Sequence, residues 1–163
     1  MCHTFASKER NNGIYYIIDN MIRSNIITKY INLSTQGENG IIDITNNVKK
    51  ILLESKLKNG IITLFVVGST AAITTIEFES GLTKDFPNML ERIAPNDTEY
   101  EHDKTWHDGN GHAHVRASLI GPSLTIPFIN GETSLGTWQQ IVFVELDTSS
   151  RERKVVAQII GED

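Results

Sequence analysis

The stretch Asp108-Gly-Asn-Gly-His-Ala-His-Val-Arg-Ala-Ser-Leu-Ile-Gly-Pro-Ser123 carries the most distinctive pattern of this chain. Residues 109–111 are glycine and asparagine, which tolerate positive φ and therefore predict a tight turn. After the turn the residue types alternate, with polar side chains at every second position: His112, His114, Arg116 and Ser118. Because successive side chains of a strand point to opposite faces, this alternation predicts a β-strand with one polar face. We expect the functional surface on that face.

More strands are predicted on the C-terminal side of this stretch. Residues 124–128 alternate and lead to Asn130-Gly131, a dipeptide typical of a hairpin turn. Two further apolar runs, residues 138–145 and 154–160, each predict a strand. The basic residues Arg151 and Arg153 between these runs are expected in a solvated turn.

On the N-terminal side, an apolar stripe that includes Val48 and Leu52 predicts a helix, with Asp43 or Thr45 as N-cap and Asn59-Gly60 as its C-terminal stop. The β-branched run of residues 61–67 predicts a central strand covered on both faces, and residues 71–79 a second strand. Residues 82–93 predict another helix, in which Pro87 is tolerated only within the first turn. Residues 99–107 are expected to form an irregular loop.

These elements define the expected fold class. A chain of 163 residues, 39 % of them hydrophobic, suits one domain with a real core. Seven or eight strands with two or three helices, not regularly alternating, predict an α+β fold with a mixed or mostly antiparallel sheet. We expect this domain over residues 26–163. Residues 1–25 are expected to be an extension, made of a polar tail and a short amphipathic helix that includes Ile14, Ile18 and Met21.

Composition also limits the class of function. The single cysteine, Cys2, excludes an intrachain disulfide and a cysteine-based zinc cluster. No apolar run approaches the length of a membrane span and no secretory signal is visible, so we expect a cytoplasmic protein without a membrane partner. The net charge of −5 argues against nucleic acid as a partner.

The histidines are the main candidates for chemistry. His102, His107, His112 and His114 lie within 13 residues. On a strand, His112 and His114 would point to one side about 7 Å apart, within reach of one divalent metal such as zinc or magnesium. The same imidazoles could instead hold a substrate phosphate together with Arg116 and no metal. The alternative without function is a set of solvated histidines.

Other polar residues extend this candidate site. Ser69 and Thr70 follow a buried strand and offer hydroxyls and amides to an anion, although the break at Gly68 is equally typical of a β-bulge. Glu77 is a candidate general base or metal carboxylate, and a solvated strand edge explains it as well. The remaining candidates for binding a phosphorylated small molecule are Ser123, Thr137 and Gln139.

Two stretches resemble a known family. The run from Gly109 to Pro127 closely resembles the YjbQ-like family, and so does Leu135-Gly-Thr-Trp-Gln-Gln-Ile-Val142. The similarity extends from about Lys29 to Gly161. Members of this family are often labelled secondary thiamine-phosphate synthase enzymes.

The resemblance implies a compact α+β protein that assembles as a homotrimer, with a polar pocket near the subunit boundaries. It implies joining of an aminopyrimidine diphosphate to a thiazole phosphate, with Mg²⁺ bridging the diphosphate that leaves. The residues that match the family's polar pocket are Glu77, His102, Asp108, His114 and Gln139. Of these, His102, His114, Glu77 and Asp108 would be catalytic.

The chain departs from the family pattern at two positions. Many members have His-Thr-Thr or His-Thr-Ser where this chain has Gly68-Ser69-Thr70, so one pocket imidazole is missing. The asparagine before the family's glutamate is replaced by Ile76. The resemblance therefore leaves three hypotheses for function. They are a thiamine-phosphate synthase, a metal-dependent phosphohydrolase or related hydrolase, and a non-catalytic trimer that binds a metabolite or anion.

Overall fold

The computed structural model describes residues 8–11, 14–17 and 25–163. In chain order the elements are β1 (Lys8–Asn11), β2 (Ile14–Ile17), β3 (Asn25–Ser34), β4 (Gly40–Asp43), α1 (Thr45–Ser55), β5 (Asn59–Val67), β6 (Ala71–Ile76), α2 (Leu82–Ile93), α3 (Glu101–Trp106), α4 (Gly111–Ile120), β7 (Ser123–Ile129), β8 (Glu132–Thr133), β9 (Gln140–Glu145) and β10 (Glu152–Glu162). None of these helices has the length and hydropathy needed to cross a lipid bilayer.

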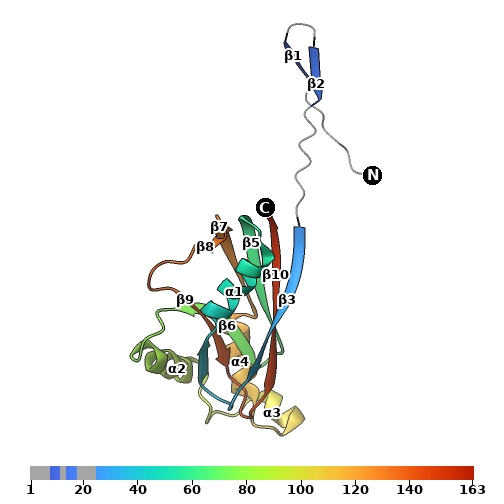
Figure 1. Ribbon diagram of the computed structural model, residues 1–163. Helices are drawn as coiled ribbons and strands as arrows, with labels where there is room; N and C mark the ends of the chain where they lie inside the picture. The colour runs from blue at the N-terminus through green and yellow to red at the C-terminus, as the bar shows by residue number, and fades with distance from the viewer. Residues whose placement is uncertain (1–7, 12–13, 18–24) are drawn as a thin grey trace.

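Two antiparallel sheets form the body of the domain (Figure 1). The larger has the order β3-β10-β5-β7-β8 and the smaller the order β4-β9-β6. The α+β class is confirmed, and the eight strands of these sheets match the expected number, whereas the described residues contain four helices instead of two or three. β1 and β2 pair separately, so the predicted helix is wrong over residues 14–17, and residues 8–11 are a strand. The rest of that predicted helix, including Ile18 and Met21, lies outside the described residues.

The domain has three layers. One face of the small sheet packs on the large sheet around a core that contains Ile62, Leu64, Ile141 and Phe143, closed by α1. Its other face packs on α4 and α2 through a second core, whose members include Val142, Val144, Ala113, Ala117 and Leu90. β9 is therefore the strand buried on both faces.

The outer face of the large sheet lies open. Within one chain, residues 61–67 are covered on one face and not on the two that were predicted, because β5 buries only alternate side chains. Ile61, Phe65 and Val67 are 39 %, 46 % and 50 % exposed. In the large sheet, β10 lies between β3 and β5, with Val156 opposite both Tyr30 and Phe65.

The two predicted long helices form, with different ends. α1 ends where Lys56 takes a left-handed conformation at φ 62°, so Asn59-Gly60 begins β5 instead of stopping the helix. Asp43 accepts a hydrogen bond from the backbone N–H of Thr45 at 2.8 Å, but makes no regular N-cap. α2 begins at Leu82, so Pro87 lies beyond its first turn.

The central prediction of a strand over residues 112–118 is wrong, because α4 occupies this stretch. The buried side chains of α4 are spaced four apart, in the pairs Ala113 with Ala117 and His112 with Arg116. That is the spacing of one helical face against the small sheet. The expected loop of residues 99–107 likewise contains a helix, α3. Figure 1 shows α3 at one end of the body and the β7–β8 hairpin at the other.

Candidate functional site

Helices α3 and α4 bring together the two histidines that were predicted to be catalytic. The ring centroids of His102 on α3 and His114 on α4 lie 4.2 Å apart, with the ring planes tilted by 40°. Burial, and then the neighbouring His102, lower the pKa of His114 below its ordinary value of 6.5. A histidine of this kind is neutral near pH 7 and can accept a proton.

Two carboxylates lie beside His102. The Nε2 atom of His102 is buried, has no hydrogen-bond partner, and lies 3.7 Å from Oδ1 of Asp108. Asp103 completes a group in which one ligand atom from each residue lies within 4.8 Å of the others. Asp103 is also held by the fold, because its Oδ1 accepts a hydrogen bond from the backbone N–H of Gly111 at 2.8 Å. This group joins one nitrogen and two oxygen donors, a set that suits a divalent cation.

A cavity of 140 Å³ adjoins His114. Its walls are His114, the β5–β6 connection with Gly68 and Ser69, and the α4–β7 corner with Ser118 and Pro122. The predicted neighbourhood of Ser69 and His114 therefore exists, and an exposed hydroxyl lies near a neutral imidazole. Gly68 has φ 141° and joins strands of two different sheets.

His112 and Arg116 serve the fold instead of this cavity. His112 is 2 % exposed and its Nε2 contacts a carboxylate oxygen of Glu38. Arg116 is 1 % exposed and donates hydrogen bonds to the carbonyl of Ala94 and the carboxylate of Glu91. Residues two apart on a helix point in different directions, so the predicted metal pair of His112 and His114 lacks the common face that a strand would have supplied.

Thr70 belongs to a buried polar network that the sequence did not reveal. Its hydroxyl donates to Oδ2 of Asp147 at 2.8 Å and accepts from Arg153 at 2.9 Å. Arg153, expected in a solvated turn, is 8 % exposed and makes a bidentate pair with the fully buried Glu145. Asn110 joins the network through a hydrogen bond to Asp147. These charges tie the start of α4 to the β9–β10 turn, and so help to position the residues around His114.

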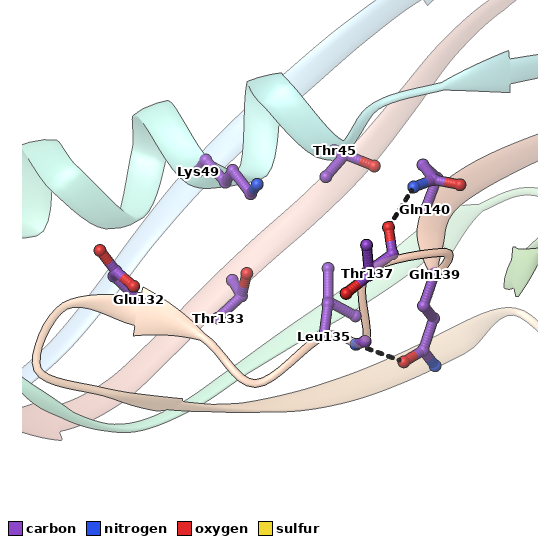
Figure 2. A pocket seen from close by; sticks show the side chains of 9 residues that line it. Thr45, Lys49, Glu132, Thr133, Leu135, Thr137, Gln139 and Gln140 are labelled. Carbon is purple, nitrogen blue, oxygen red and sulfur yellow. Dashed lines mark hydrogen bonds between the residues drawn. The ribbon is translucent and has the colours of Figure 1, made fainter. Parts of the chain in front are cut away.

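A second cavity of 330 Å³ contains the other predicted binding residues (Figure 2). Its walls come from α1, β8 and the loop before β9: Thr45, Lys49, Glu132, Thr133, Leu135, Gly136, Thr137, Gln139 and Gln140. The side chains of both glutamines form hydrogen bonds within the protein. Gln139 accepts from the backbone N–H of Gly136 at 3.1 Å and donates to Thr75 at 3.0 Å. They shape the loop more than they offer groups to a ligand.

The predicted site residues therefore divide into two groups within one chain. Ala71, at the start of β6, lines the cavity of His114, whereas Ile76 at its end pairs with Gln140 of the second cavity. Glu77 is exposed and follows that far end. Ser123 is exposed at the start of β7, opposite Phe65, and lines neither cavity. A site that needed Glu77 and His114 together would take more than one chain.

Comparisons with known proteins agree with this architecture. A family model described as UPF0047 protein YjbQ-like matches residues 29–162. A UPF0047 protein of Methanothermobacter thermautotrophicus is 41 % identical over 136 residues, which are 83 % of this chain and 93 % of that protein. A second UPF0047 protein, from Archaeoglobus fulgidus, is 33 % identical over 80 % of this chain and 98 % of its own length.

Solved structures share the fold. A YbjQ-like protein from Sulfolobus solfataricus P2 has a TM-score of 0.80 at 34 % identity, covering 86 % of this chain and all of that one. The protein APE1520 from Aeropyrum pernix K1 has a TM-score of 0.76 at 32 % identity, covering 83 % and 99 %. On the family match, the sequence identities and the shared fold together, the chain belongs to the YjbQ-like UPF0047 family.

Proposed function

We propose that the chain is an enzyme that uses a divalent cation, held by His102, Asp108 and Asp103, to act on the phosphate group of a small molecule. The observation that carries this proposal is the orphaned Nε2 of His102, buried 3.7 Å from a carboxylate oxygen of Asp108. That separation is too long for a hydrogen bond. Two ligands of one tetrahedral zinc lie about 3.4 Å apart, so small adjustments would let one cation satisfy both atoms.

His114 supplies the second part of the proposed chemistry. Its lowered pKa keeps the ring neutral near pH 7, and it lines a cavity that also contains Ser69. A bound cation would polarise a phosphoryl oxygen and stabilise the charge that develops on a leaving phosphate. His114 would accept the proton of an attacking hydroxyl or water, and Ser69 would donate a hydrogen bond to a phosphate oxygen.

Two reactions fit this arrangement. In the first, water attacks a phosphate ester, and the chain is a phosphohydrolase. In the second, which the family resemblance implies, a thiazole phosphate displaces the diphosphate of an aminopyrimidine and forms thiamine phosphate. We place hydrolysis first, because the 140 Å³ cavity beside His114 is small for two phosphorylated substrates in one chain.

To test the proposal, metal-depleted protein is supplied with Mg²⁺, Mn²⁺ or Zn²⁺, and turnover of each substrate is monitored by ³¹P NMR. The substrates are p-nitrophenyl phosphate and the aminopyrimidine diphosphate, the latter with and without the thiazole phosphate. We expect metal-dependent phosphate release that is lost in His102→Gln and retained in His107→Asn, whose parent side chain is exposed and outside the ligand group. Metal binding without turnover of any substrate would contradict the proposal and favour the binding-protein hypothesis.

We further propose that the chain self-associates through the outer face of the large sheet, as the homotrimer that the resemblance implies. Three cross-strand rows on this face contain no charged residue: Ile26–Ile160–Ile61–Pro127, Thr28–Gln158–Thr63–Thr125 and Tyr30–Val156–Phe65–Ser123. Two of these rows are mostly apolar, and Lys154 lies on the same face with its Nζ 5.4 Å from the centroid of the Tyr30 ring. An exposed sheet face with uncharged apolar rows at its centre and charge near its edge is typical of a contact between subunits.

Light scattering tests the assembly. We expect particles of three chains of 18.2 kDa each, and a smaller species for Phe65→Lys, which places a charge in the centre of the face. Leu53→Lys is the matched control, because Leu53 is 77 % exposed on α1, away from this face. A monomeric wild type, or an unchanged mass for Phe65→Lys, would contradict this part of the proposal.

A further inference from the structure

The second cavity is lined by a cation and by hydroxyls that the proposed metal site does not use. Lys49 and Thr45 lie four residues apart on α1, and therefore on one face of the helix. Figure 2 shows both side chains on the helix side of the cavity, with Thr133 and Thr137 on the opposite side. Among the described residues, Lys49 forms no ion pair.

The surrounding contacts hold the cavity in shape and leave these donors available. The hydroxyl of Thr45 accepts a hydrogen bond from the backbone N–H of Ile141 at 2.8 Å, so its own proton remains free to donate. Gln139 fixes the loop through its bonds to Gly136 and Thr75, which presents the exposed hydroxyl of Thr137 to the cavity. One ammonium and three hydroxyls can together donate hydrogen bonds to a ligand that has several acceptor oxygens.

We infer that this cavity is a second ligand site, which binds the phosphate group of a phosphomonoester through Lys49 and the hydroxyls of Thr45, Thr133 and Thr137. Its 330 Å³ volume lies in the range of small-metabolite pockets. Glu132, exposed at the same cavity, is the one carboxylate among the lining residues and opposes the bound phosphate. This inference does not rest on the proposed metal chemistry, because the two cavities share no residue.

Inorganic phosphate is the probe, titrated by calorimetry and by ¹H–¹⁵N NMR into metal-depleted protein at constant ionic strength. We expect saturable binding with shifts at Thr133 and Thr137. Loss of a charge-assisted hydrogen bond should weaken binding about tenfold or more in Lys49→Gln. Lys50→Gln is the matched control, because Lys50 lies next to Lys49 in sequence but lines a different cavity. Glu132→Gln should bind more tightly than the wild type.

Other results of these titrations would contradict a phosphate site at Lys49. Absence of saturation, unchanged binding in Lys49→Gln, or an equal loss in Lys50→Gln would overturn the inference. The His102→Gln variant separates the two proposals, since it should lose metal-dependent turnover while it binds phosphate as the wild type does. Loss of phosphate binding in His102→Gln would place the anion at the other site and overturn the inference.

Discussion

The imidazole rings of His102 and His114 lie 4.2 Å apart, although they belong to different helices. A turn at residues 107–110 joins α3 and α4, and Asp103 anchors it by accepting the N–H of Gly111. Gly111 is required there, because a Cβ at this position would lie 2.4 Å from the Cβ of Tyr100. The pairing of the histidines thus follows from how closely the two helices approach.

The proximity of His102 should be visible in the measured pKa of His114. Burial, followed by the neighbouring His102, lowers the pKa below 6.5. The imidazole of His114 is therefore protonated at a higher pH in the unfolded chain than in the folded one. Because proton binding favours the unfolded chain, the free energy of unfolding decreases as the pH drops through about 6.5. NMR titration should place the pKa of His114 below 6.5 in the wild type and higher in His102→Gln. A value at or above 6.5 in the wild type would contradict the geometry.

Asp147 should make the fold sensitive to acid. Burial raises its pKa, but hydrogen bonds from Arg151, the Ser149 amide, Thr70 and Asn110 outweigh burial and hold the pKa at about 2. Relative to 3.8 in the unfolded chain, the carboxylate contributes about 2 kcal/mol above pH 4, which is lost as the pH falls towards 2.

Denaturant unfolding checks this contribution. Asp147→Asn should destabilise the domain by about 2 kcal/mol at pH 7, and the difference from wild type should shrink as the pH approaches 2. An equal difference at both pH values would show that Asp147 acts through packing and not through its charge.

Arg153 should matter because it neutralises Glu145, which is fully buried. Arg153→Met leaves that carboxylate without its cation and should cost about 3–5 kcal/mol. Adding Glu145→Gln should recover part of the loss, and a double-mutant cycle in urea measures the coupling. If the free-energy losses of the two single variants add up to the loss of the double variant, Arg153 and Glu145 are not coupled, which would contradict the ion pair.

Gly68 should tolerate substitution poorly. Its φ of 141° is one that side chains rarely adopt, and an added Cβ would lie 3.0 Å from Nη1 of Arg153. Gly109 is the matched control, with φ 63° and no atom within 4 Å of an added Cβ. Gly109→Ala should cost about 1 kcal/mol and Gly68→Ala clearly more, by thermal unfolding. Equal costs would show that Arg153 moves aside freely.

Much of the fold was predictable where one local signal dominates. The apolar stripe of Val48 and Leu52 gave α1, the β-branched run gave β5, and Asn130-Gly131 forms the β7–β8 turn with both φ angles positive. These features depend on neighbouring residues in the sequence, and neighbouring residues determine helices, strands and tight turns.

The strand prediction for residues 112–118 was wrong because their sequence fits both the two-residue period of a strand and the spacing of a helix. Residues 112, 114, 116 and 118 alternate, but Ala113 with Ala117 and His112 with Arg116 also fit the spacing of a helix. The helical spacing prevails because alanine favours helix and both pairs are buried. The networks of Arg116 with Glu91 and of Arg153 with Glu145 join separate elements, so only the tertiary fold shows which charges are buried.

Titration calorimetry determines whether His102, Asp103 and Asp108 bind a cation. Isothermal titration of Zn²⁺ and Mg²⁺ into metal-depleted protein should give one saturable site per chain for the wild type and for His107→Asn. His102→Gln and Asp108→Asn should each lose that site while they keep the wild-type circular dichroism spectrum and assembly. Absence of a saturable site in the wild type, or a site that survives in His102→Gln, would show that the orphaned nitrogen of His102 serves no cation.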